Sequence, residues 1–115
     1  MTKVNSGIKF EYSVRDYLQA KGYEVVRAAG SKGAVDLVAF DDVYGILIQA
    51  KKELRKSNYA SDEERLRNTK CPPNFTKQMW IKTNRTITVV EIEGEGKTTI
   101  HTMSISEMNK VIKND

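Results

Sequence analysis

An acidic residue, Asp36, lies thirteen positions before the tripeptide Gln49-Ala50-Lys51. Asp36 sits inside one apolar run and the tripeptide ends the next, so both segments are expected to be strands. Polar groups in such runs are costly to bury without partners, which indicates that they have a role. A carboxylate facing an amide oxygen and a lysine on a neighbouring strand provides the groups that metal-dependent phosphodiester cleavage needs.

The chemistry assigns a different task to each candidate residue. Asp36 can offer a carboxylate, Gln49 a side-chain oxygen and Ala50 a backbone carbonyl to a divalent cation. Glu11 can complete this set directly or through water. Lys51, on the same strand face as Gln49, can orient the attacking water or stabilise developing negative charge. We therefore expect a hard cation, Mg²⁺, with Mn²⁺ able to substitute.

Basic and hydroxyl groups surround these candidates in the sequence. Ser31 and Lys32 lie in a glycine-flanked turn just before Asp36. Arg27 lies near the end of the predicted strand 23–28, and Lys52 directly follows the predicted strand 44–51. Together they would suit contacts to DNA phosphates. Each residue also has an ordinary structural interpretation: the turn can be a plain hairpin, and a lone lysine can extend into water.

The elements that must position these residues follow from periodicity and turn signals. A helix is expected over 7–21, capped by Ser6 and ended by Gly22, with Glu11 at the rim of its apolar stripe. Further elements are expected in this order: strands 23–28, 34–40 and 44–51, a short helix 61–68, strands 77–82, 86–93 and 97–103, and a final helix opened by a capping box at Ser104. This order favours an α/β (α+β) fold with a mostly antiparallel sheet, in which strand 44–51 is central.

Length and composition limit the alternatives. The 115 residues suffice for one domain, 1–115, with one core, and no apolar stretch approaches a membrane span. One cysteine, Cys71, and one histidine, His101, are too few for a Cys/His zinc site. The net charge of +4 is compatible with a polyanionic partner. We expect an intracellular protein, cytoplasmic or nucleoid-associated, or in the host cytoplasm if the source is viral.

At this point the sequence resembles the archaeal-type Holliday junction resolvases, which belong to the PD-(D/E)XK nuclease superfamily. The resemblance rests on Glu11, the run 22–39 with its Arg-Ala-Ala-Gly-Ser turn and Asp36, and the segment 48–51. It covers about the first half of the chain. It implies the nuclease core, a central mixed β-sheet flanked by helices, and Mg²⁺-dependent endonucleolytic cleavage of branched DNA by a homodimer. By the same resemblance, Glu11, Asp36 and Lys51 occupy acidic and lysine positions of the family.

Two positions depart from the family pattern. Gln49 stands where the family usually has glutamate, which removes one negative charge and should weaken metal binding unless Glu11 or the substrate phosphate compensates. Tyr12 stands where the resolvases often carry arginine, which bears on the preference for four-way junctions.

Two alternatives therefore remain open. The first is a catalytically weak or inactive nuclease fold that only binds nucleic acid. The second is a restriction- or repair-type nuclease acting on non-junction DNA or on RNA, whose unpaired bases Tyr59, Phe75 and Trp80 could stack.

Overall fold

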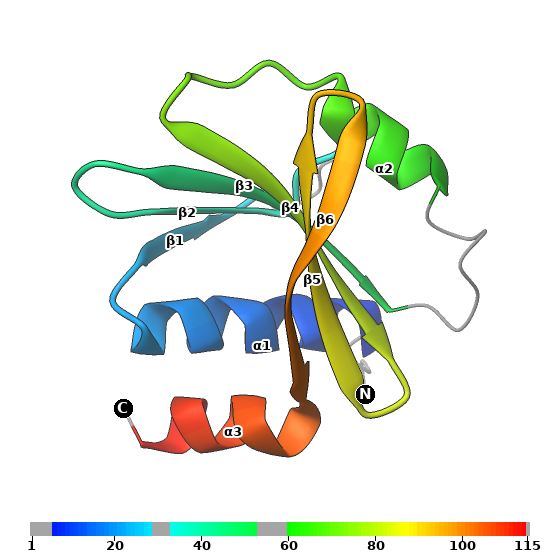
Figure 1. The fold of residues 1–115 in the computed structure, drawn as a ribbon. Helices are drawn as coiled ribbons and strands as arrows, with labels where there is room; N and C mark the ends of the chain where they lie inside the picture. Colours follow the sequence, from blue (N-terminus) through cyan, green and yellow to red (C-terminus); the bar gives the residue numbers. More distant parts are fainter. Residues whose placement is uncertain (1–5, 29–32, 53–59, 115) are drawn as a thin grey trace, which may run out of the picture.

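The computed structural model describes residues 6–28, 33–52 and 60–114. Within these residues the chain forms one six-stranded sheet and three helices (Figure 1). In chain order they are α1 (Ser6–Ala20), β1 (Glu24–Arg27), β2 (Leu37–Phe40), β3 (Gly45–Lys52), α2 (Ala60–Arg67), β4 (Phe75–Thr83), β5 (Thr86–Glu93), β6 (Gly96–Ser104) and α3 (Ile105–Lys113). The predicted element order and fold class, a mixed sheet flanked by helices, are confirmed.

The strands lie in the sheet in the order in which they occur in the chain. Four of the neighbouring pairs are antiparallel, and β3 and β4 are parallel. A parallel pair needs a crossover connection, and the segment that contains α2 provides it. The strand that carries Gln49 is therefore central, between β2 and β4, as predicted.

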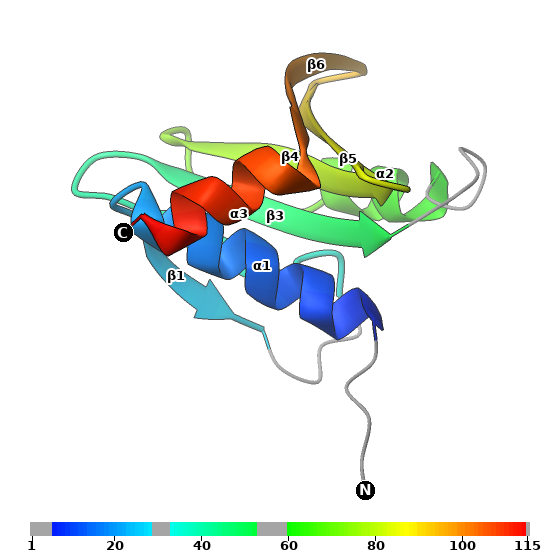
Figure 2. The ribbon, with the colours of Figure 1, turned by 90° about the horizontal axis from the view of Figure 1, so that it is seen from below.

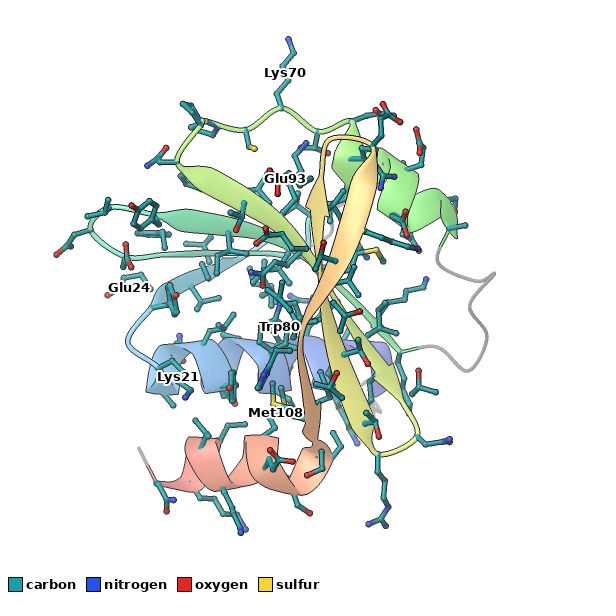
Figure 3. All side chains as sticks on the ribbon, in the orientation of Figure 1. Lys21, Glu24, Lys70, Trp80, Glu93 and Met108 are labelled. Carbon is teal, nitrogen blue, oxygen red and sulfur yellow. The ribbon has the colours of Figure 1, made fainter. Side chains whose placement is uncertain are left out.

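Helices cover both faces of the sheet. The helices α1 and α3 pack side by side on one face, and α2 lies on the other (Figures 1 and 2). The larger core lies under α1 and α3 and includes Val14, Ile48, Trp80 and Met108, of which Figure 3 labels the last two. A smaller core beneath α2 contains Leu66. The strand β3 contributes residues to both cores, so both of its faces are covered.

The first helix follows its predicted pattern closely. Phe10, Val14, Tyr17 and Leu18 are all buried against the sheet. The helix ends before Gly22, whose φ of 100° is a left-handed conformation that favours glycine. The same stripe that fixes this helix on the sheet also fixes the position of Glu11 at its edge.

Several predicted boundaries need correction. β2 begins at Leu37, three residues later than predicted, so Asp36 lies just before the strand instead of inside it. Leu37 pairs with Arg27, the last residue of β1. Asp36 is still tied to the chain on both sides, because its carbonyl accepts from the N–H of Ala28 at 2.9 Å and its N–H donates to Ile48. In the second half of the chain, β4 and β6 are longer than predicted.

The aromatic residues of the second half are partly placed. Trp80 is buried in the larger core, and its indole N–H donates to Oε1 of Gln78 at 2.9 Å. Phe75 is half-buried against the smaller core, and Tyr59 lies outside the described residues. A base-stacking role for Trp80 is therefore wrong. Among the described helices, none is both long enough and apolar enough to span a membrane.

Gly45 is a position where a side chain would not fit. A Cβ at this first residue of β3 would collide with the ring of Phe75, its partner on β4. We expect Gly45→Ala to lower the free energy of unfolding by about 1–3 kcal/mol, as overpacking does. Urea unfolding measures the effect, with Gly96→Ala as the control, because a Cβ there meets its nearest heavy atom at an ordinary 3.7 Å. Equal effects of the two substitutions would contradict this account.

Candidate active site

The strand β3 brings the tripeptide of the predicted site into the middle of the sheet. Side chains alternate between the two faces, so Leu47, Gln49 and Lys51 lie on the face that α2 covers. Gln49 is 7 % exposed, which is unusual for an amide side chain without a structural or functional reason. Ile48 and Ala50 lie on the opposite face, in the larger core.

Asp36 is held against this strand by its backbone and by its side chain. Its backbone N–H donates to the carbonyl of Ile48 at 2.8 Å. Its Oδ2 accepts two hydrogen bonds of 3.0 Å, one from Nε2 of Gln49 and one from the backbone N–H of Ala50. The Asp36 carboxylate thus lies beside the tripeptide, as the sequence predicts, although Asp36 precedes the strand β2.

Only one end of the Gln49 side-chain amide is hydrogen-bonded within the described part of the chain. Among the described residues, Oε1 of Gln49 is a buried side-chain oxygen without a hydrogen bond, while Nε2 of the same amide is engaged by Asp36. An unpaired buried acceptor costs free energy of the order of 1–3 kcal/mol unless something else satisfies it. An oxygen next to a carboxylate and free to coordinate is what a hard divalent cation requires, so the donor set fits such an ion.

The described part of the chain offers few acidic ligands for this ion. Within it, no three histidine, cysteine, aspartate or glutamate side chains gather closely enough to hold a metal. A cation beside Asp36 would therefore depend on amide and backbone oxygens and on water. Mg²⁺ tolerates this, because it usually keeps several waters and takes only one or two carboxylates from the protein.

Burial dominates the electrostatics of Asp36. It raises the pKa of the Asp36 carboxyl from 3.8 to about 6, against the opposing effect of the Ala50 N–H. The negative charges of Glu11 and Asp62 raise this pKa further, and the ammonium group of Lys51 lowers it. The site thus disfavours an ionised Asp36 until a positive charge is added, and a bound cation would supply that charge.

The raised pKa has a measurable effect on stability. The folded protein binds the Asp36 proton more tightly than the unfolded chain, so stability falls as the pH rises through the interval from 3.8 to about 6. The full shift corresponds to roughly 3 kcal/mol, and solvent screening of this half-buried group reduces it to about 1–2 kcal/mol. In EDTA, Asp36→Asn should therefore be more stable than the wild type at pH 8 and no more stable at pH 4. Urea unfolding at both pH values measures this, and a variant less stable at pH 8 would contradict it.

Lys51 has a partner that the sequence did not predict. Its Nζ lies 3.1 Å from Oδ2 of Asp62, a residue of α2, and Oδ1 of Asp62 accepts from Arg65 at 2.6 Å. Burial raises the pKa of the Asp62 carboxyl, but the hydrogen bonds and charges of Arg65 and Lys51 together hold it below its ordinary value. Lys51 is therefore held over the strand face instead of extending freely into water. The sequence predicts a short helix over 61–68, but no pattern in that segment links Asp62 to the site.

Glu11 and Arg27 form an ion pair with one another. Nε of Arg27 donates to Oε1 of Glu11 at 3.2 Å, and the guanidinium carbon of Arg27 lies 5.3 Å from the ring centroid of Tyr12. Arg15 lies over the same ring at 4.7 Å. The helix carboxylate thus reaches the edge of the site and affects Asp36 by its charge. Tyr12, which departs from the family pattern, stacks against both arginines.

The remaining predicted residues are only partly described. Lys52, the last residue of β3, is exposed, which suits a phosphate contact. Ser31 and Lys32 lie outside the described residues. The structure therefore brings Asp36, Gln49, Ala50 and Lys51 together, and places Glu11 with Arg27 at the margin.

A mixed sheet with a helix carboxylate, an acid before one strand and a Gln-x-Lys sequence on the next is the arrangement of a PD-(D/E)XK nuclease. A family model described as "Archaeal holliday junction resolvase (hjc)" matches residues 2–109. The chain belongs to this family, whose members are nucleases that act on branched DNA.

A solved structure agrees with this fold. Hjc of Archaeoglobus fulgidus, a Holliday junction resolvase from an archaeal hyperthermophile, superimposes with a TM-score of 0.60 at 17% sequence identity. The similarity covers 92% of this chain and 89% of that one. No curated protein sequence matches the chain.

Proposed function

We propose that this protein is a Mg²⁺-dependent endonuclease that cleaves phosphodiester bonds in branched DNA, with its chemistry centred on Asp36. The observation that carries the proposal is the contact of the Asp36 carboxylate with Gln49 and with the N–H of Ala50, beside an unpaired amide oxygen. We assign catalysis to Asp36 and Gln49, together with Glu11 and Lys51. The metal ligands would be Asp36, Gln49, the Ala50 carbonyl and Glu11.

The reaction is the addition of water across one phosphodiester bond. The water oxygen attacks phosphorus, the bond to the leaving oxygen breaks, and that oxygen takes up a proton. A Mg²⁺ ion held by these residues would supply polarisation of the phosphate and a lower pKa for the attacking water. Lys51 is placed to stabilise negative charge on the phosphate oxygens, and its ion pair with Asp62 fixes where its ammonium group lies.

Basic groups around the site support the binding of DNA. Arg27 and Lys52 lie at the ends of β1 and β3, and the chain carries a net charge of +4. We assign phosphate contacts to these two residues and to Ser31 and Lys32. We also propose that residues 1–115 act as one nuclease domain in a homodimer, because two cuts placed symmetrically in a junction call for a two-fold axis. A nuclease of this family would act on cellular DNA, in the cytoplasm or nucleoid, or in the host cytoplasm if the source is viral.

A second candidate function is nucleic-acid binding without efficient catalysis. Its support is the neutral Gln49, whose amide donates to Asp36 but adds no second negative charge beside that carboxylate. Against it stands the cost of keeping a buried acid and an unpaired oxygen side by side in a protein that only binds.

A panel of substrates separates these functions. The purified protein is incubated in Mg²⁺ with labelled four-way junction, flap, single-stranded and linear duplex DNA, and with an RNA of matched sequence. Paired symmetric cuts in the junction alone are the expected result. Cutting of another DNA or of RNA would keep the nuclease and reject the junction as its substrate. Binding of junction DNA with no cutting of any substrate would favour the second function.

A further inference from the structure

Asp62 occupies a place on α2 that normally takes an apolar residue. It and Leu66, four residues later, are the buried residues of this otherwise polar helix. Leu66 packs in the smaller core beneath the helix, so Asp62 also faces the sheet. Burying a carboxylate is costly, and an apolar side chain at this position would pack without that cost. An acid in the first turn favours a helix, but Glu63 in the same turn also provides one, so helix formation does not explain why the acid at position 62 is buried.

The contacts of Asp62 link it to the candidate site. Its Oδ2 lies 3.1 Å from Nζ of Lys51, and its negative charge raises the pKa of Asp36. Its other partner, Arg65, has a side chain that is 54% exposed, whereas that of Asp62 is 9% exposed. Water screens an exposed charge more strongly than a buried one, so Asp62 acts on the site more than Arg65 does.

The charges at the site show what Asp62 would change. Asp36 carries one negative charge, Lys51 one positive charge, and Gln49 none, so these three side chains together are neutral. A neutral cluster has little attraction for a divalent cation. The carboxylate of Asp62 makes the sum negative by one charge and offsets the repulsion that Lys51 would exert on the cation. Glu11 also adds negative charge, and its effect on the pKa of Asp36 ranks above that of Asp62. Glu11 is paired with Arg27, however, whereas Asp62 contacts Lys51, the cation of the site.

We propose that Asp62 is the second acidic group of this site: it holds the Lys51 ammonium in place and supplies the negative charge that Gln49 lacks, so that a divalent cation can bind beside Asp36. Asp62 acts as a positioning residue and not as a direct ligand, in keeping with the lack of any three-residue acidic cluster among the described residues. This inference rests on the proposed metal-dependent function.

The test measures the binding of Mn²⁺ in the absence of DNA, by electron paramagnetic resonance, for four proteins. They are the wild type, Asp62→Asn, Gln49→Glu and the double variant. Asp62→Asn should weaken Mn²⁺ binding about tenfold, the size expected for the loss of one nearby charge in a partly buried site. Gln49→Glu restores a negative charge at the strand position. The double variant should therefore bind Mn²⁺ within about threefold of the wild type. If Asp62 only stabilised the fold, a charge added at position 49 would not restore the binding of Mn²⁺.

A matched control comes from the next residue of the same helix. Glu63 is also ion-paired, with Arg67 and Lys97, and its side chain is 15% exposed. Among the described residues, these ion pairs do not link Glu63 to Asp36, Gln49 or Lys51. Glu63→Gln should leave Mn²⁺ binding unchanged. Thermal melting verifies that each variant is folded, and Asp62→Ser replaces Asp62→Asn if the asparagine variant does not fold. Asp62→Glu, which keeps the charge, should retain most of the affinity.

Two results would overturn the inference alone: Mn²⁺ affinity that is unchanged in Asp62→Asn, or a double variant that binds as weakly as Asp62→Asn does. A wild-type protein that binds no Mn²⁺ and cuts no substrate would overturn the proposed function, and the inference with it.

Discussion

Replacing Asp36 with asparagine is expected to lower the rate of DNA cleavage by at least about 10³-fold, because the substitution removes the central carboxylate of the site. The asparagine can keep the hydrogen bond from Ala50, so the local backbone should remain in place. The affinity for DNA should stay within about threefold of the wild type, because this carboxylate is not assigned a phosphate contact. Single-turnover cleavage in Mg²⁺ and a binding titration in Ca²⁺ measure the two quantities separately.

The control for this substitution is Asp42→Asn, in the exposed turn between β2 and β3. It makes the same chemical change six residues away and should leave both quantities unaltered. If Asp36→Asn lost DNA binding and stability together with cleavage, Asp36 would have a structural role, and its assignment to catalysis would be wrong.

The second large effect is expected at Lys51. Lys51→Met keeps most of the length of the side chain and removes its charge, and it should lower kcat by about 10²- to 10⁴-fold with little change in KM. The physical reason is the loss of the ammonium group that Asp62 holds over the strand face. The substitution should not weaken the binding of Mn²⁺, because it removes a positive charge from the vicinity of the cation.

Lys52→Met provides the contrasting variant for this prediction. Lys52 is exposed at the end of β3 and is assigned a phosphate contact, so its loss should raise KM and leave kcat nearly unchanged. Steady-state kinetics on one substrate at fixed salt compare the two variants. A Lys51→Met enzyme with normal kcat and raised KM would mean that Lys51 only binds the DNA backbone.

Much of this fold could be predicted from the sequence because its elements carry regular patterns. The apolar residues of α1 recur with the period of a helix, and the side chains of β3 alternate with the period of a strand. Both periods are properties of the sequence itself and do not depend on tertiary contacts. The capping box at Ser104 is formed as predicted, with Glu107 N–H donating to Oγ of Ser104 at 3.0 Å. The contact between Asp36 and Gln49 followed from the placement of these residues in adjacent segments.

The parts that could not be predicted depend on contacts between distant elements. Asp62 follows Lys51 by eleven residues, and no local pattern indicates that the crossover segment brings α2 over the face of β3. The apolar run 34–40 also does not reveal that regular pairing with β1 and β3 begins only at Leu37. The pairing of Glu11 with Arg27 likewise arises only when α1 packs beside β1.

The central claim is that cleavage depends on a divalent cation held beside Asp36. The most direct test follows the cutting of a labelled four-way junction by the wild-type protein in Mg²⁺, after addition of EDTA, and after Mg²⁺ is restored in excess. We expect paired symmetric cuts that stop in EDTA and resume when Mg²⁺ returns. Cutting that continues in EDTA, or an intact junction that remains bound at every Mg²⁺ and Mn²⁺ concentration, would contradict the account.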